Sequence, residues 1–167
     1  SGNMNVELLE WIRYNYPISK ADLFGCFISR VFTLLYNNGF IGMITMESWM
    51  FLSSFDELRN QLLNKSLITT LIHMPYLGKG GTSLGINLGT CAFVLKLIQK
   101  PTLEEGFYQC IRYFETDDEG KPLRFPTINE KINTIHQNNF RKIPNNPISY
   151  WLSQKWISIF SHEKIED

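Results

Sequence analysis

Residues suited to anion binding gather in one glycine-rich segment, 75–89, which reads PYLGKGGTSLGINLG. Backbone N–H groups of the glycines, together with the ammonium group of Lys79, have the chemistry of a phosphate site. However, the segment lacks the Gly-x-x-x-x-Gly-Lys-Ser/Thr spacing of a nucleotide phosphate loop, and no helix is predicted directly after it. Its composition predicts a flexible loop between two strands.

The other reactive side chains predict structural roles. His73 ends an apolar run, where a histidine is typically hydrogen-bonded within the fold. The acidic run 117–119 predicts a solvated turn, because neighbouring carboxylates on a turn point apart and do not converge on a metal. Cys26, Cys91 and Cys110 lie in apolar segments without the paired spacing of a zinc site or a redox pair, so we expect buried thiols. No metal site is predicted.

Length and charge limit the class of protein. The 167 residues fit one domain, and 16 basic residues are balanced by 16 acidic ones. No strong overall field therefore draws the chain to nucleic acid or to a membrane, which weakens the case for a nucleic-acid binder that acts alone. No apolar run reaches the roughly 20 residues of a membrane-spanning helix, and no signal peptide is recognisable, so we expect a cytoplasmic protein.

The elements that must position these residues are organised around Ser19–Thr45. Ser19 is expected to cap a helix that ends at Gly39 in a left-handed conformation. The apolar run Phe40–Thr45 then predicts a strand buried on both faces, as in parallel sheets. The helix is predicted by apolar residues at the spacing of one helical face, namely Leu23, Phe24, Phe27, Ile28, Val31, Leu34 and Leu35.

Helices and strands alternate on either side of this unit. Met4–Tyr16 predicts an amphipathic helix, and a capping box of Ser54 and Glu57 predicts another. The second helix leads to a strand at Leu67–Met74, which a right-handed crossover would place parallel to Phe40–Thr45 and next to it. This order predicts a layered α/β sheet.

The C-terminal part is less regular. Thr90–Leu97 and Gly106–Phe114 have no helix between them, so these two strands are expected to pair antiparallel or to lie at a sheet edge. Residues 129–138 are weakly helical. A final helix is predicted at Ile148–Phe160 with Asn146 as its N-cap. Its apolar stripe, which indicates a docking arm or the start of a further domain, consists of Trp151, Leu152, Trp156, Ile157 and Phe160.

Several segments, in this order, resemble a known enzyme family. They are ADLFGCFI at 21–28, NGFIGMIT at 38–45, SWMFLSS at 48–54, LITTLIHM at 67–74 and GTCAFVLK at 89–96. Together they are similar to the C-terminal half of the catalytic domain of N6-adenine-specific DNA methyltransferases, above all the large enzymes of BREX-type phage defence and related type II restriction-modification enzymes. The similarity covers roughly residues 4–97, and IPNNPISYW at 143–151 matches more loosely.

The resemblance implies a partial Rossmann-like class I methyltransferase sheet, with parallel strands plus an antiparallel edge pair and flanking helices. It also implies S-adenosylmethionine as the methyl donor and adenine N6 in DNA as the acceptor. Enzymes of this family bind the donor on a glycine-rich turn and hold the flipped adenine with an Asn/Asp-Pro-Pro-Tyr/Phe tetrapeptide. Neither motif is in this sequence, and His73-Met74-Pro75-Tyr76 lacks the Asn or Asp of the second.

We therefore expect a fragment that holds the fifth to seventh strands of the family's sheet and does not methylate by itself. Residues 1–115 would come from the catalytic domain, and residues 116–167 would be a linker and helical extension. The partners would be DNA and the missing N-terminal half of the same polypeptide. Cutting the sheet bares the edge of Phe40–Thr45, so self-association through that edge is also expected.

The resemblance assigns site residues as well, although none is predicted to be catalytic. Phe27 matches an aromatic residue that lies against the adenine of the cofactor, while the periodicity of its helix favours a core position. Trp49 follows the Phe40–Thr45 strand, where a stacking surface for DNA would be useful, and position alone equally allows a ring folded back on the helix. The candidates for contact with the DNA backbone are Lys79, Gly80, Gly81 and Thr82.

Two other classes of function stay open. One is a non-catalytic α/β interaction module that binds a protein partner through its Trp-rich terminal helix. The other is a different Rossmann-like enzyme, such as a nucleotide-dependent oxidoreductase, which is disfavoured because no Gly-x-Gly-x-x-Gly follows a predicted strand.

Overall fold

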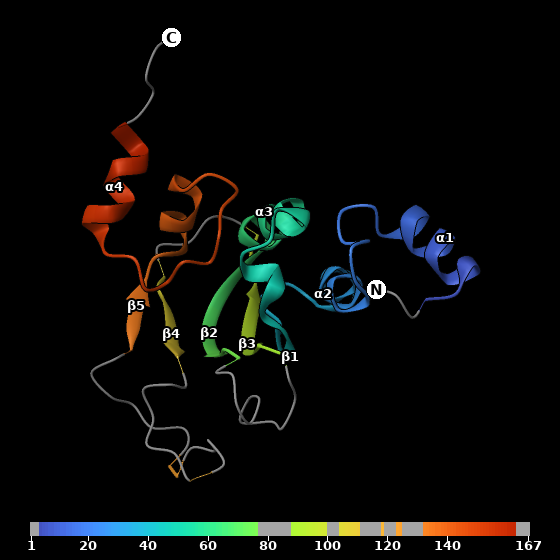
Figure 1. The fold of residues 1–167 in the computed structure, drawn as a ribbon, viewed down its shortest axis with the longest axis horizontal. Helices are drawn as coiled ribbons and strands as arrows, with labels where there is room; N and C mark the ends of the chain where they lie inside the picture. The colour runs from blue at the N-terminus through green and yellow to red at the C-terminus, as the bar shows by residue number, and fades with distance from the viewer. Residues whose placement is uncertain are drawn as a thin grey trace.

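The computed structural model describes residues 4–76, 88–99, 104–110, 118, 123–124 and 132–162. Figure 1 shows α1 and α4 at opposite ends of the molecule, with the sheet and α3 between them. The helices are α1 (Val6–Asn15), α2 (Leu23–Leu34), α3 (Asp56–Lys65) and α4 (Gln154–His162), and the short 3-10 helices are η1 (Glu47–Met50), η2 (Ser53–Phe55) and η4 (Gln137–Lys142). The strands are β1 (Phe40–Met46), β2 (Ser66–Met74), β3 (Thr90–Leu97), β4 (Gly106–Cys110) and β5 (Asn133–Ile135).

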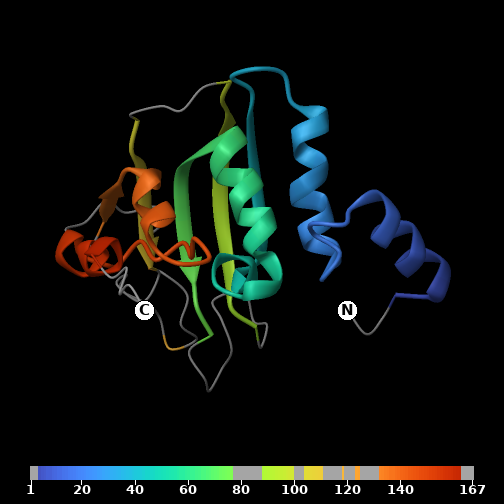
Figure 2. The same cartoon turned by 90° about the horizontal axis from the view of Figure 1, so that it is seen from above.

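The sheet is mixed, with the strand order β1-β3-β2-β4-β5. Strand β3 is antiparallel to both of its neighbours, β2 and β4 are parallel, and β4 and β5 form an antiparallel pair at one edge. α2 and α3 lie side by side over one face of the sheet (Figure 2). A mixed α/β sheet with flanking helices is the fold class predicted from the sequence.

The neighbours of individual strands differ from the prediction. β1 and β2 run in the same direction, but β3 lies between them, so that Phe93 is aligned with Met43 on one side and with Leu71 on the other. The predicted direct pairing of Phe40–Thr45 with Leu67–Met74 is therefore wrong. β3 and β4 were expected to pair antiparallel or to lie at a sheet edge, but they are not neighbours and the edge strands of the described sheet are β1 and β5. β3 buries Cys91, Phe93 and Leu95 on one face and leaves Ala92 and Val94 half-buried on the other, but alternation along a strand carries no information about which strand lies beside it.

β1 lies at the sheet edge, as expected, but it is not buried on both faces. Phe40 and Ile44 are 59% and 63% exposed. Their face of the sheet has no covering helix among the described residues, and a hollow of about 290 Å³ lies there, lined in part by Thr70, Ala92 and Val94. Within the described residues, β1 therefore has an open edge beside an apolar sheet face.

The predicted helix caps are not formed. Ser19 is buried beneath α2, where its hydroxyl accepts a hydrogen bond from Ser29 at 2.9 Å. The N-cap of α2 is Asp22, whose side chain makes no capping hydrogen bond. Ser54 lies in η2, and α3 begins only at Asp56, so no capping box forms. The buried loop at Ser19 precedes α2, and the 3-10 turn η2 precedes α3, so neither helix starts with the predicted cap.

The C-terminal segment also differs from the prediction. The described part of the weak helix predicted at 129–138 contains β5 and the start of η4, because this stretch pairs with the edge of β4. The last helix begins at Gln154, not at Ile148. Asn145 and Asn146 have positive φ angles of 62° and 49°, so the chain turns there and Asn146 caps no helix.

One core joins the sheet, the helices and this C-terminal segment. Its largest fully buried side chains include Trp49, Leu58, Tyr108 and Phe140, and Ile148 lies among them. The free thiols of the chain are buried, which confirms the prediction for Cys26, Cys91 and Cys110. No helix in the described ranges is long and apolar enough to cross a membrane.

The phenol of Tyr108 provides a test of this core. It is fully buried, and its hydroxyl has no hydrogen-bond partner among the described residues. We expect Tyr108→Phe to raise the free energy of unfolding by about 1–2 kcal/mol, because the variant no longer buries an unsatisfied polar group. Urea denaturation at neutral pH measures the change, with the exposed Tyr14→Phe as a matched control. Equal or lower stability of Tyr108→Phe would contradict the assigned environment.

Alkaline pH should destabilise the fold through the same core. Burial raises the pKa of the Cys91 thiol from 9.0 to about 12, and burial also raises the pKa of the Tyr108 phenol from its ordinary value of 10.0. The folded state therefore keeps these protons at a pH where the unfolded chain has lost them, so stability falls as pH rises above about 9. Each group contributes up to roughly 1.4 kcal/mol per pH unit, and Tyr108→Phe should flatten the decline above pH 10.

Candidate functional site

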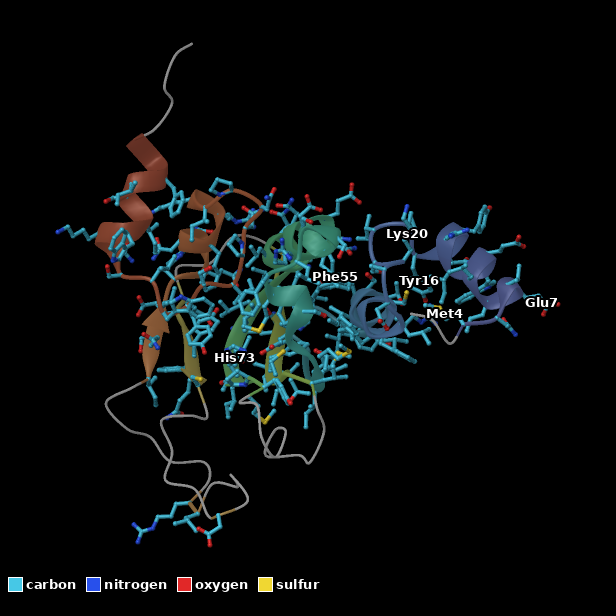
Figure 3. The ribbon with its side chains drawn as sticks, viewed as in Figure 1. Met4, Glu7, Tyr16, Lys20, Phe55 and His73 are labelled. Atoms are coloured by element: carbon cyan, nitrogen blue, oxygen red, sulfur yellow. The ribbon has the colours of Figure 1, made fainter. Side chains whose placement is uncertain are left out.

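Polar and aromatic side chains meet where β1 and β2 end. These strands run in the same direction, and open α/β sheets bind ligands beyond the carboxyl ends of their parallel strands. Glu47 follows β1 directly, and its backbone N–H donates to the carbonyl of Gly89 at 3.0 Å, just before β3 begins. His73 is the penultimate residue of β2 (Figure 3). The site is thus assembled at the carboxyl edge of the sheet.

His73 links two segments that are distant in the sequence. Its Nε2 contacts a carboxylate oxygen of Glu47, and its Nδ1 lies 2.9 Å from the hydroxyl of Tyr150. If Nε2 donates to the carboxylate, the neutral imidazole leaves Nδ1 to accept from the phenol. The side chain of His73 is 9% exposed, whereas that of Glu47 is 27% exposed. His73 is therefore the hydrogen-bonded structural histidine that the sequence predicts.

Aromatic rings surround this histidine. Trp151 is stacked on it, with ring centroids 6.5 Å apart and an interplanar angle of 22°. Phe51 contacts both rings, at 5.8 Å from His73 and 5.5 Å from Trp151. Tyr150 is in turn stacked on Tyr108 at 5.8 Å, deep in the core. The result is a continuous row of rings from the sheet interior to the surface.

Arg59 fastens the segments that carry these rings. This guanidinium is fully buried and donates to three backbone carbonyls, those of Trp49 at 2.8 Å, Leu52 at 2.7 Å and Asn145 at 2.8 and 3.1 Å. Burial lowers the pKa of its side chain. Arg59 thereby ties α3 to η1 and to the turn that leads to Tyr150. The role of Arg59 was not predictable from the sequence, because an arginine in an amphipathic helix is usually exposed.

Gly89 is required next to the carboxylate. A Cβ atom at this position would overlap the side-chain carboxylate of Glu47. From the sequence, this glycine was predicted only to lie in a loop. In the structure, its lack of a side chain leaves room for the Glu47–His73 contact. Neither Glu47 nor Tyr150 was predicted as a site residue, since 26 and 77 residues separate them from His73.

The residues predicted from the resemblance lie in different places. Trp49 is fully buried, donates to the Thr45 hydroxyl at 3.0 Å and packs on Phe93, so its ring has no exposed face for a base. Trp49 is therefore a core residue. The sequence alone had equally allowed a ring exposed for stacking and a ring folded back on the helix. Phe27 is 63% exposed on α2, contrary to the core position that periodicity favoured. Lys79, Gly80, Gly81 and Thr82 lie outside the described residues.

No group of three or more His, Cys, Asp or Glu side chains within the described part of the chain is arranged to hold a metal ion. The chemistry of the site is therefore that of a carboxylate, an imidazole and a phenol in contact, beside an aromatic surface.

The sequence around this site is similar to that of known proteins. The sequence profile of the Eco57I restriction-modification methylases matches residues 1–78. The adenine-specific methyltransferase BrxX of Escherichia coli O9:H4 (strain HS) is 36% identical over 94% of the chain. The chain is homologous to adenine-specific methyltransferases. The methyltransferase PglX of Lacticaseibacillus casei (strain Zhang), also adenine-specific by name, is 34% identical over 97% of the chain, so the homology reaches well beyond the profile match.

The chain spans 13% and 14% of the lengths of these two methyltransferases. A chain in a solved structure of a type I R-M system has a similar fold, with a TM-score of 0.58 and 15% identity; the match covers 90% of this chain and 38% of that chain. The methyltransferase resemblance seen in the sequence is thus confirmed. The homologous region includes Glu47, His73 and Tyr150, since it extends through nearly the whole chain.

Proposed function

We propose that residues 1–167 form part of an adenine-specific DNA methyltransferase that transfers a methyl group from S-adenosylmethionine to N6 of adenine in DNA. The observation that carries the proposal is the similarity to BrxX and PglX over 94% and 97% of the chain. The mixed sheet with its flanking helices supports it. On the family resemblance, the complete protein would act in restriction-modification or phage defence.

Phe27 is the residue proposed to contact the methyl donor. S-adenosylmethionine supplies the transferable methyl group and carries an adenine ring. The exposed ring of Phe27 on α2 fits one face of such an adenine. The glycine-rich turn that binds the donor in this family is not expected in this sequence, so the remaining contacts are proposed to come from elsewhere in the polypeptide. Lys79, Gly80, Gly81 and Thr82 stay candidates for contacts with the DNA backbone.

The open edge of β1 has a proposed partner in the same polypeptide. A strand edge with free N–H and C=O groups pairs readily with another strand, and the apolar face beside Ile44 favours cover by further elements. The relatives are many times longer than this chain, so their polypeptides contain additional segments that could provide this cover. Residues 1–167 alone would then be inactive.

A comparison of two samples tests the proposed function. The full-length protein that carries these residues should methylate adenine N6 in DNA, measured by transfer of labelled methyl groups and digestion to nucleosides. The chain of residues 1–167 alone should transfer none and should show no tight binding of S-adenosylmethionine by calorimetry. Methylation of cytosine by the full-length protein would refute the adenine assignment, and tight donor binding by residues 1–167 would refute the fragment interpretation.

Self-association of residues 1–167 gives a separate prediction. We expect the isolated chain to dimerise or to form larger species at high concentration, because β1 offers an unpaired edge. Ile44→Lys should shift it towards monomer, since the charge would be placed in the apolar contact, whereas Val6→Lys on α1, also an exposed site, should not. Sedimentation velocity measures both. A wild-type monomer at high concentration would contradict this role of the edge.

A second candidate function has one observation in its favour. α4 exposes Trp156, Ile159 and Phe160. Trp156 and Phe160 belong to the apolar stripe predicted from the sequence, whereas Ile157 of that stripe is buried. A non-catalytic module that binds a protein partner through α4 would use this surface. A full-length protein that methylates no DNA, yet loses a protein contact when Trp156 is replaced by Ala, would favour this second candidate.

A further inference from the structure

The indole of Trp151 is exposed to solvent, yet it packs against three other rings. It is 51% exposed, although one side of the ring is stacked on His73 and its edges contact Phe51 and Tyr150. Trp11 on α1 is 54% exposed, and among the described residues its ring pairs with one other aromatic ring, that of Tyr16. The two tryptophans are similarly exposed, but the ring of Trp151 is held by three aromatic contacts and that of Trp11 by one.

The support beneath Trp151 is fixed by hydrogen bonds. His73 is held at both ring nitrogens, by the Glu47 carboxylate and by the Tyr150 hydroxyl. Tyr150 itself is only 2% exposed and stacks on Tyr108. An aromatic side chain that is already immobilised loses little conformational entropy when a flat ligand stacks on it.

The segment that carries Trp151 has a positive net charge, whereas the nearest carboxylate, that of Glu47, is engaged with His73 and 27% exposed. Residues 132–162 contain the basic side chains Arg141, Lys142 and Lys155 and no Asp or Glu, whereas the whole chain has equal numbers of basic and acidic residues. Arg141 donates to the amide of Asn64 and Lys142 to that of Asn139, both neutral partners. Lys155, four residues after Trp151, is exposed. Phosphates of a strand that passes along this segment would meet its positive charge.

We propose that Trp151 is a stacking surface for an unstacked nucleobase of DNA, held in place by the Glu47–His73–Tyr150 hydrogen bonds. The proposal rests on the proposed function, because an enzyme that acts on a base must take it out of the helical stack. Trp151 lies at the carboxyl edge of the sheet, where such a base would approach. Stacking on an aromatic ring tolerates any base, so this surface would contribute affinity rather than sequence specificity.

The test uses the full-length protein and three variants, Trp151→Ala, Trp151→Phe and Trp11→Ala. The probes are a single-stranded oligonucleotide and a duplex with one unpaired 2-aminopurine, whose fluorescence falls when the base stacks. We expect Trp151→Ala to weaken binding of both probes about ten-fold and to reverse the quenching of 2-aminopurine. Trp151→Phe should keep most of the affinity and most of the quenching, and Trp11→Ala should match the wild type in both. Binding of S-adenosylmethionine should be unchanged in all three.

Two results would overturn the proposal. One is wild-type affinity and quenching in Trp151→Ala. The other is equal loss in Trp151→Phe and Trp151→Ala together with a lower melting temperature, which would show a purely structural role. Failure of the proposed function is a separate outcome, because the adenine methylation assay on the wild-type protein detects it without reference to Trp151.

Discussion

Arg59→Met is expected to lower the free energy of unfolding by about 3–5 kcal/mol, because one buried and two part-buried carbonyls lose a charged donor at once. A side chain of similar length fills the space but offers no N–H group. The buried carbonyl of Trp49 and the part-buried carbonyls of Leu52 and Asn145 would then lose this donor. For a chain of this size the melting temperature should fall by roughly 10 °C.

Arg59→Met should also increase local motion in the segment that Arg59 holds. Its hydrogen bonds hold the turn at Asn145, and that turn leads to Tyr150 and Trp151. Amide hydrogen exchange should therefore increase around residues 145–151 before it increases in β3. Arg30→Met on the exposed side of α2 is the matched control and should change neither quantity. A melting temperature of Arg59→Met equal to that of Arg30→Met would show that the buried guanidinium is not needed.

Gly106→Ala is the second change with a large expected effect. A Cβ atom at Gly106 would overlap the backbone oxygen of Ile68 in β2 and would come within 3.0 Å of the Tyr108 hydroxyl. A backbone oxygen in a paired strand cannot move aside without disturbing the ladder between β2 and β4. We expect a loss of about 3 kcal/mol or more, at the upper end of what overpacking costs.

Gly42→Ala is a control for the same chemical change in a strand. Its Cβ atom would meet only Phe93 and Val94, each at 4.0 Å, so there is room for the methyl group. Urea denaturation should therefore show a lower midpoint for Gly106→Ala and no loss for Gly42→Ala. Equal midpoints in the two variants would contradict the close approach of β4 to β2.

The sequence predicts the elements of this fold better than their arrangement. The helices α1 and α2 and the strands β1, β2 and β3 appear where the hydrophobic periodicity places them. Their order in the sheet was not predictable in the same way, because burial of a strand's two faces does not identify its neighbours. The C-terminal segment was predicted as linker and helix, yet Phe140, Ile148 and Tyr150 lie in the common core.

The candidate site could be predicted only in part. His73 was expected to be hydrogen-bonded, but its partners come from positions 26 and 77 residues away. Arg59 and Asn145 are 86 residues apart, and nothing in the local sequence of either one indicates the contact. Such contacts follow from tertiary structure, whereas the family resemblance rests on local segments that the sequence already contains.

The place of β3 between β1 and β2 has a consequence for biosynthesis. A nascent chain that has left the ribosome only as far as Met74 contains two parallel strands that in the native sheet are separated by the width of a third. These strands have no correct partner until Leu97 has also emerged, so their edges stay open to aggregation or chaperones during that interval. Synthesis rate across residues 75–97 would thus set how long the nascent protein needs protection.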